Sequence, residues 1–464
     1  MRVFCIPFVC FIFLLDYSLF AQELQSEEHE SGGALNSLSN SAENPCISLE
    51  QYRQIERRCV ENSKSLHLDD RILGSISSTL FQWPLQQAPG FHDCSYYSIV
   101  NYVDEDSTSG ILDYNCGKAT YDGHRGIDIA IMPFPFLKMD TNAVQIIAAA
   151  PGVIIDKADG NFDKNCAMNS NPANYVIVQH SDGSVALYWH MKKTTVTKKK
   201  VGDAVVLGEV LGNVGSSGSS TGPHLHFEVW KTTSPSSLQE TYSGDCNRFN
   251  KNSWWATQKP YTEPAIVKVS TNDSLIGLPP CPQTETPHEG SVFKTGATSV
   301  KFTIFLRNET PGINAAMRIL NAAGVQQANW AHNPNTSYGQ SYWYWNRTLN
   351  MPAGKYTFEA SYNGDTCRSS FTLTTSESID QNTDASTVHV YSSELDGNIH
   401  VLLPEIPQSN DVLELSDLLG RNVLRQNLNQ QCTVIPTTLK QGVYAYRIVI
   451  GGIVKTGLLS QSIE

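Results

Sequence analysis

The sequence predicts an all-β-dominated protein in which a helical N-terminal region precedes a β-rich domain and two C-terminal β-sandwich domains. From about residue 81 to 275, short runs rich in β-branched and aromatic residues are separated by Gly, Asn, Asp and Ser, as at Tyr175–Val178 and Val205–Leu207. Apolar and polar residues alternate again at 291–374 and after 388. Only residues 46 to about 80 show the spacing of a helix.

The first residues have the order of a secretory signal peptide. Arg2 supplies a positive charge, Val3–Leu15 is almost wholly apolar, and the small residue Ala21 precedes a predicted cleavage point. The apolar run is too short to cross a bilayer of about 30 Å as a stable helix. We therefore expect a signal peptide at 1–21, no stable transmembrane span, and a protein exported through the periplasm to the cell surface or the medium.

Residues 22–80 are predicted to combine a flexible segment with a helical region. Ser, Glu and Asn dominate up to residue 44, which is typical of a flexible N-terminus. Helical spacing then follows, with Ser48 as a candidate N-cap. The apolar residues with this spacing are Ile47, Leu49, Tyr52, Ile55 and Val60.

Three further domains are expected from the changes in composition. The β-rich domain extends over 81–275 and ends before the Pro-rich linker 278–282. A β-sandwich is predicted at 285–375, because Val300, Phe302, Ile304 and Leu306 lie on one face of a strand. A polar stretch separates it from a last β domain at 388–464.

Charge and cysteine usage restrict the functional classes. The net charge of −12 argues against a nucleic-acid partner, which needs a basic patch. Nine cysteines follow residue 21, which suits disulfides in an oxidising compartment. Because nine is odd, at least one thiol is free or pairs between chains. The pairs that we expect are Cys46–Cys59, Cys94–Cys116, Cys166–Cys246 and Cys281–Cys367, with Cys432 left over.

Two histidines share one face of a predicted strand. In the run 224–230, HLHFEVW, His224 and His226 are two residues apart and point to the same side, about 6.5–7 Å apart along the strand. Both imidazoles can therefore enter one groove. The small, polar loop 215–223 before them would let a substrate backbone approach closely.

A second pair, His124 and Asp128, would be about 13 Å apart on a straight strand. A bend at Gly126 would bring both to one point. Two imidazoles and one carboxylate suit Zn²⁺ with a fourth position for water, and a further histidine such as His190 can accept a proton or stabilise an oxyanion. A histidine on a strand is more often structural, and His180, which precedes a turn, is interpreted in that way.

At these residues the sequence resembles the LytM/lysostaphin-type metallopeptidases of family M23. The matching stretches, in the family's order, are 121–129 (YDGHRGIDI), 150–153 (APGV), 176–183 (VIVQHSDG), 187–191 (LYWHM), 201–203 (VGD), 208–212 (GEVLG) and 219–229 (SSTGPHLHFEV). The resemblance implies an antiparallel sheet with a groove above it. It also implies one Zn²⁺ per chain on His124, Asp128 and His226, with His190 and His224 as the catalytic pair.

The resemblance further implies an endopeptidase that cuts peptide cross-links of bacterial peptidoglycan through a metal-activated water. Inserts at 132–145 and 160–174 leave the substrate open. The alternatives are a peptidase on Gly-rich proteins and a non-catalytic wall-binding or regulatory module. The aromatic run 342–345 favours packing, with sugar binding as the alternative. No residue in 22–80 is marked as a metal-blocking ligand, so an inhibitory pro-segment there stays open.

The last domain is similar to the sorting domains of the type IX secretion system. The suggestive stretches are 415–421 (LSDLLGR), 439–444 (LKQGVY) and 451–456 (GGIVKT). The usual Pro-Asn-Pro near the start is replaced at 392–394, and Leu458 stands where the family has Lys. The resemblance implies the type IX secretion machinery as a partner, with removal of this domain during export.

Overall fold

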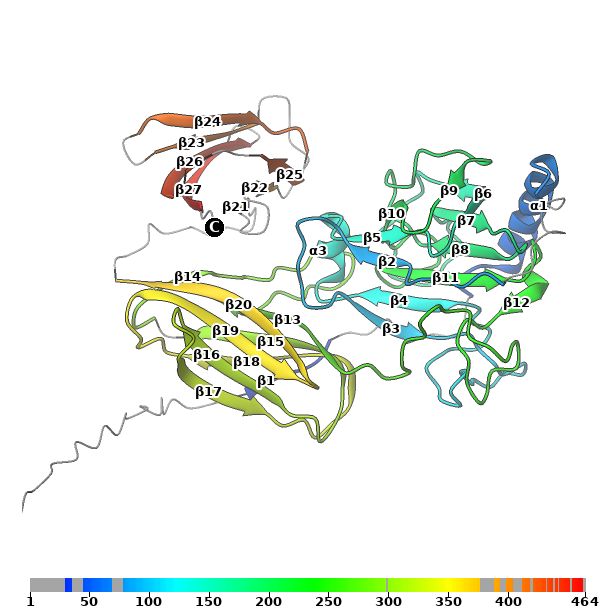
Figure 1. The fold of residues 1–464 in the computed structure, drawn as a ribbon, viewed down its shortest axis with the longest axis horizontal. Coiled ribbons are helices and arrows are strands. Elements are labelled where there is room, and N and C mark those ends of the chain that lie inside the picture. Colours follow the sequence, from blue (N-terminus) through cyan, green and yellow to red (C-terminus); the bar gives the residue numbers. More distant parts are fainter. Residues whose placement is uncertain are drawn as a thin grey trace, which may run out of the picture.

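The computed structural model describes residues 30–35, 45–68, 78–297, 299–375, 388–392, 398–403, 411–417, 420–430, 432–436, 439–440, 442–450 and 453–461. The predicted signal peptide 1–21 lies outside these residues. Strands dominate, and within the described residues they form six sheets (Figure 1). The predicted fold class is confirmed. Within the described residues, no helix combines the length and the apolar character needed to cross a membrane.

An eight-stranded antiparallel sheet carries the candidate site. Its strands, in spatial order, are β3 (Tyr97–Asn101), β4 (Ile127–Ile131), β11 (His224–Trp230), β8 (Val185–Trp189), β7 (Tyr175–Gln179), β6 (Gly152–Ala158) and β9 (Ala204–Val205), with β12 (Leu238–Gln239) paired to β11. A small sheet of β2 (Leu85–Gln87), β5 (Val144–Ile147) and β10 (Val210–Asn213) lies beside it. The short helices α3 (Pro135–Asp140) and η1 (Pro235–Ser237) complete this unit.

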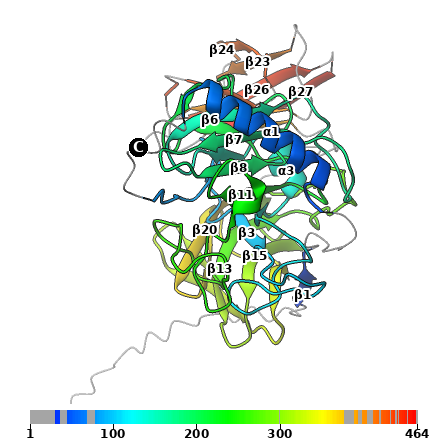
Figure 2. The ribbon, with the colours of Figure 1, turned by 90° about the vertical axis from the view of Figure 1, so that its right-hand side faces the viewer.

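The two faces of the large sheet bury different partners. Leu225, Phe227 and Val229 of β11 point into the main core of this unit. Trp230 points the other way, into a second apolar cluster that also contains Ile55 of the helix α1 (Leu49–Ser65). This alternation along β11 places His224 and His226 on the side that α1 covers. Figure 2 shows α1 lying across β6, β7 and β8.

Local sequence explains α1. Ser48 accepts a hydrogen bond from the backbone N–H of Gln51, and the Gln51 side chain accepts one from the N–H of Ser48. This reciprocal capping box satisfies donors that the first turn leaves free. The predicted cap at Ser48 is confirmed. Tyr52, Ile55 and Cys59 form the buried face, whereas Leu49 is exposed.

Two sheets form the next unit around one apolar core. One contains β1 (Glu30–Ala34), β18 (Tyr338–Arg347), β15 (Val300–Glu309) and β13 (Ala265–Asn272). The other contains β14 (Val292–Lys294), β20 (Asp365–Thr374), β19 (Gly354–Tyr362), β16 (Ala315–Asn321) and β17 (Gln326–His332). Both β1 and β13 precede the segment in which the sequence predicts a sandwich. In the aromatic run of β18, Trp345 is buried and Tyr342 stacks on Phe305, which favours packing.

The last strands form two smaller sheets with a core of their own. One contains β21 (His389–Ser392), β22 (Ile399–Leu402) and β25 (Cys432–Ile435). The other contains β24 (Asn422–Asn427), β23 (Val412–Ser416), β26 (Gly442–Ile450) and β27 (Ile453–Gln461). The two sheets face each other (Figure 1), so this part of the chain also has the sandwich architecture that was predicted.

The disulfides differ from every predicted pair. The structure joins Cys94 to Cys367, Cys116 to Cys246, and Cys166 to Cys281, with sequence separations of 273, 130 and 115 residues. Cys46 and Cys59 are free and buried. The prediction paired cysteines mainly by closeness in sequence, whereas two of the bridges in the structure join the unit of the large sheet to later parts of the chain. The side chain of Cys432 lies outside the described residues.

Candidate metal centre

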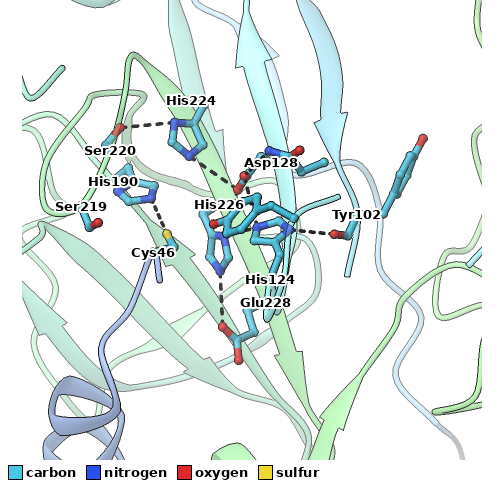
Figure 3. Close-up of polar contacts among 12 residues, drawn as sticks. Cys46, Tyr102, His124, Asp128, His190, Ser219, Ser220, His224, His226 and Glu228 are labelled. Carbon is cyan, nitrogen blue, oxygen red and sulfur yellow. Dashed lines mark hydrogen bonds and ion pairs between the residues drawn. The ribbon is translucent and has the colours of Figure 1, made fainter. Parts of the chain in front are cut away.

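Strand register brings four of the five predicted site residues together. Asp128 on β4 is directly opposite His226 on β11, and Trp189 on β8 is opposite His226 on the other side. His190 follows Trp189, and His224 lies two residues before His226 on the same face. The four side chains therefore converge on one region of the sheet (Figure 3).

His124 reaches the same point because the chain changes direction before β4. The backbone N–H of His124 donates to the carbonyl of Tyr121, closing a turn that contains Gly123 at φ +73°. A bend follows at Gly126, as predicted. A Cβ at Gly126 would lie 2.6 Å from Cε1 of His226, so only glycine permits this approach. Nε2 of His124 lies 3.2 Å from Oδ2 of Asp128.

Three atoms of these side chains have the separations of a metal site. Nε2 of His124 is 3.2 Å from Nδ1 of His226, which in turn is 2.9 Å from Oδ1 of Asp128. One ligand atom from each residue falls within 4.8 Å of the others. In a tetrahedron with metal–nitrogen distances of about 2.0–2.1 Å, neighbouring ligands are about 3.3 Å apart. The donor set and its spacing therefore fit Zn²⁺.

Neighbouring groups orient each of the three side chains. Nδ1 of His124 lies 2.7 Å from the carbonyl oxygen of Tyr102, so Nδ1–H donates and Nε2 keeps its lone pair. The amide of Asn101 donates to Oδ2 of Asp128 at 2.9 Å. Nε2 of His226 is 3.3 Å from a carboxylate oxygen of Glu228, which leaves Nδ1 directed at the centre. Such outer contacts fix the tautomer and rotamer of metal ligands.

His190 and His224 are held in the tautomer that a base requires. Nδ1 of His190 is 2.6 Å from the carbonyl oxygen of Ser217, and Nδ1 of His224 is 2.8 Å from that of Gly222. Because a carbonyl only accepts, both Nδ1 atoms carry hydrogen and both Nε2 atoms have a lone pair. The two ring centroids are 4.4 Å apart. His190 has φ +68°, a strained conformation typical of functional sites.

The electrostatics of the site keep Asp128 ionised and His190 neutral. Burial raises the pKa of Asp128, but His124 and His224 outweigh it and hold this pKa well below its usual value, so the group stays ionised. Burial, together with the neighbouring His224 and His226, lowers the pKa of His190 well below its usual value. His190 is therefore neutral and able to accept a proton.

The site is closed to solvent. The five residues are between 0% and 4% exposed. Part of the cover comes from the segment before α1, where the thiol of Cys46 lies 2.8 Å from Nε2 of His190. The predicted bond between Cys46 and Cys59 is not formed, because Cys46 lies at the site while Cys59 lies on the buried face of α1.

The sequence analysis missed four contributors to the site. Alternation along β11 places Glu228 on the face of His226, so the signal for Glu228 was present. Asn101, Tyr102 and Cys46 reach the site through tertiary packing and have no comparable sequence signal. His180, interpreted as structural, bonds to the carbonyl of Pro151 and packs on Phe81, away from the candidate ligands.

Comparison with known proteins agrees with this geometry. Residues 122–238 match the family model of peptidase family M23. An uncharacterized metalloprotease of Buchnera aphidicola subsp. Baizongia pistaciae is 34% identical over 119 residues, which cover 25% of this chain and 26% of that protein. The peptidoglycan DD-endopeptidase ShyC of Vibrio cholerae serotype O1 is 27% identical over 147 residues, covering 27% of this chain and 33% of ShyC.

A third relative extends the pattern. The DD-carboxypeptidase/endopeptidase Mpg of Neisseria meningitidis serogroup B is 34% identical over 107 residues, covering 23% of this chain and 20% of Mpg. The chain thus matches between 20% and 33% of the length of these relatives. The matched region contains all five candidate residues, and the family implies a metal. The comparisons therefore support a peptidase domain of family M23 over residues 122–238 of this chain.

Proposed function

We propose that this protein is an exported zinc-dependent endopeptidase that hydrolyses peptide cross-links of bacterial peptidoglycan. In this proposal His124, Asp128 and His226 hold one Zn²⁺, and His190 and His224 are the catalytic pair. The observation that carries the proposal is the convergence of three ligand atoms at tetrahedral spacing beside two imidazoles whose Nδ1 atoms face backbone carbonyls, which directs both Nε2 atoms at the centre.

The roles follow from the protonation state of each residue. When bound, Zn²⁺ lowers the pKa of a water molecule and polarises the carbonyl of the scissile peptide. His224, whose Nε2 lies 3.5 Å from Oδ1 of Asp128, is close enough to take a proton at the centre. Its partner His190 lies beside it. Once an imidazole of this pair is protonated at Nε2, it donates a hydrogen bond to the negative oxygen that develops on the substrate.

The substrate class rests on the relatives and remains part of the proposal. ShyC is named as a peptidoglycan DD-endopeptidase and Mpg as a DD-carboxypeptidase/endopeptidase. In this chain the insert at 160–174 contacts the loop before β11, since the backbone N–H of Asn169 donates to Oγ of Ser219. A Gly-rich protein is the alternative substrate, and the same assay distinguishes the two.

Export is supported by two features. The described chain contains three disulfides, which persist in oxidising compartments. The first 21 residues have the order of a signal peptide. We extend the proposal to passage through the type IX machinery, from the resemblance of 388–464. Mass spectrometry of the protein exported by its native host tests this extension, because loss of both 1–21 and the C-terminal domain is expected, and retention of the C-terminal domain contradicts it.

The first experiment measures zinc content and muropeptide release from purified peptidoglycan. The parent protein and His224→Ala are compared, each before and after mild proteolysis that removes the N-terminal segment. We expect one zinc per chain in both proteins and release by the parent alone. A parent protein without zinc, or equal release by both proteins, contradicts the proposal. Cleavage of Gly-rich protein without muropeptide release favours the alternative substrate.

A further inference from the structure

The segment before α1 places a thiol among the candidate site residues. Cys46 lies two residues before the N-cap Ser48, and its Sγ is 2.8 Å from Nε2 of His190. Its side chain also faces His226, one of the three candidate ligands (Figure 3). Cys46 is 7% exposed. Among the described residues, the group with metal-site spacing is His124, Asp128 and His226, and Cys46 lies beside it through its contact with His190.

A sulfur at this position changes the chemistry of the centre. Two imidazoles, one carboxylate and a water make an open zinc site, which is the catalytic type. Four protein ligands make a closed site, which is the structural type, and Cys is among the preferred zinc ligands. If Cys46 passed its proton to Nε2 of His190, 2.8 Å away, its thiolate would bind beside His124, Asp128 and His226 and take the position that hydrolysis needs.

Helix α1 fixes the thiol in place through polar contacts along its length. Tyr52 donates a hydrogen bond of 2.6 Å to Glu228, whose carboxylate also contacts His226. Further along, Arg58 pairs with Asp156 at 2.9 Å, and Asn62 donates to the carbonyl of Ile155 at 2.8 Å.

Apolar packing adds to this anchoring. Ile47 and Ile55 are each 1% exposed in the cluster between α1 and the sheet. A packed helix thus holds Cys46 at the centre more rigidly than a loop would.

The same helix supplies a matched control. Cys59 is also free and fully buried, but it packs beside Arg58 and Asp156, away from the candidate ligands. A measurement that responds to Cys46 but not to Cys59 therefore distinguishes a metal ligand from a buried structural cysteine.

We infer that Cys46 is a fourth protein ligand of the metal and that residues 45–68 hold the peptidase in a latent form, which rests on the proposed function. In this form no substrate reaches His190 or His224. Departure of the segment opens the fourth position and uncovers the face of the sheet that α1 occupies.

Cobalt substitution tests the ligand directly, without any substrate. The full exported chain is loaded with Co²⁺, alongside Cys46→Ala and Cys59→Ser. A thiolate-to-cobalt charge-transfer band in the near ultraviolet is expected in the parent and in Cys59→Ser, and its loss is expected in Cys46→Ala. Muropeptide release should rise at least about tenfold in Cys46→Ala, because the competent fraction of molecules increases. A band that is absent from the parent, or that persists in Cys46→Ala, overturns the inference.

Thiol protection provides a second measurement that does not depend on activity. Cys46 in the Cys59→Ser background should react slowly with a maleimide while metal is bound and at least about tenfold faster after chelation. Ile55→Asp in the same background should also raise this rate, since it loosens α1. Equal rates with and without metal overturn the inference. A parent that binds neither Co²⁺ nor Zn²⁺ instead refutes the proposed function itself.

Discussion

Two buried clusters of histidine and carboxylate in the described part of the chain differ in what surrounds the carboxylate. In the sandwich, Glu309 accepts hydrogen bonds from His332 at 2.6 Å, from Trp343 at 2.9 Å and from Ser341. In the M23 domain, Asp128 faces three imidazoles, of which His124 and His226 also direct nitrogen atoms at each other.

The difference lies in the balance of donors and acceptors. Glu309 is surrounded by donors, so its charge is compensated by the protein. At Asp128, contacts with Tyr102 and Glu228 direct one ring nitrogen of His124 and one of His226 toward the carboxylate. A cation would compensate such a set of acceptors. Among the described residues, only the cluster at Asp128 has metal-site spacing. A buried histidine beside a carboxylate is therefore insufficient evidence of a metal site.

The largest effect is expected from His226→Ala. Removing a ligand should abolish metal binding. Peptidase activity should fall further than after the loss of an outer-shell partner, which typically costs about 10- to 100-fold. The matched variant is His332→Ala in the sandwich, which should keep both properties. Metal content by mass spectrometry and muropeptide release provide the readouts. Retention of zinc by His226→Ala would refute its role as a ligand and remove the contrast between the clusters.

His224→Ala should separate metal binding from catalysis. We expect zinc to stay bound, while turnover falls about 100- to 10,000-fold, because a proton-transfer group is lost. Zinc stoichiometry and the rate of muropeptide release on the same sample measure both quantities. Loss of zinc together with turnover would place His224 among the ligands.

Asn101→Ala should have a smaller effect. The variant removes the amide that donates to Oδ2 of Asp128, and metal affinity should fall about 10- to 100-fold. Competition with a chromogenic chelator measures the affinity, and the unfolding midpoint of the metal-free protein serves as the control. An unchanged affinity would mean that Asn101 does not orient the carboxylate.

The smallest effect is expected from Glu309→Gln in the sandwich, as a change in how the free energy of unfolding depends on pH. Burial raises the pKa of Glu309, but hydrogen bonds from His332, Ser341 and Trp343 outweigh it and lower this pKa below the usual 4.5. A lowered carboxyl pKa stabilises the fold above the usual value, and this contribution is lost as the pH falls. Glu309→Gln should cost about 1–3 kcal/mol at neutral pH and weaken this acid sensitivity. Urea unfolding of both proteins at neutral and acidic pH measures the free energy of unfolding. Equal acid sensitivity in the parent and in Glu309→Gln contradicts the prediction.

Much of the site could be predicted because its signals are local. The spacing of His224 and His226 requires only that the segment is a strand, and the bend at Gly126 requires only that a small residue separates His124 from Asp128. The cap at Ser48 likewise depends on its immediate neighbours. Each of these features is determined within a few residues of chain.

The features that sequence failed to predict are long-range contacts. Cys94 and Cys367 become neighbours only after the M23 domain and the sandwich have folded and packed. The strand β1 pairs with β18 across more than 300 residues of chain, and its sequence ESGGA has no strand signal. Cys46 meets His190 because α1 docks on a sheet whose strands come from several later segments.

The disulfide between Cys94 and Cys367 makes that part of the backbone a covalent ring. The candidate metal ligands, the proposed catalytic pair and most of the sandwich belong to this ring, whereas Cys46 and α1 belong to an open tail that enters it at Cys94. Since Cys46 and Cys59 form no disulfide, a single cut between Leu68 and Cys94 breaks every covalent link between tail and ring. After such a cut only the packing of α1 and the pairing of β1 with β18 hold the tail, while a single cut inside the ring leaves its two ends joined.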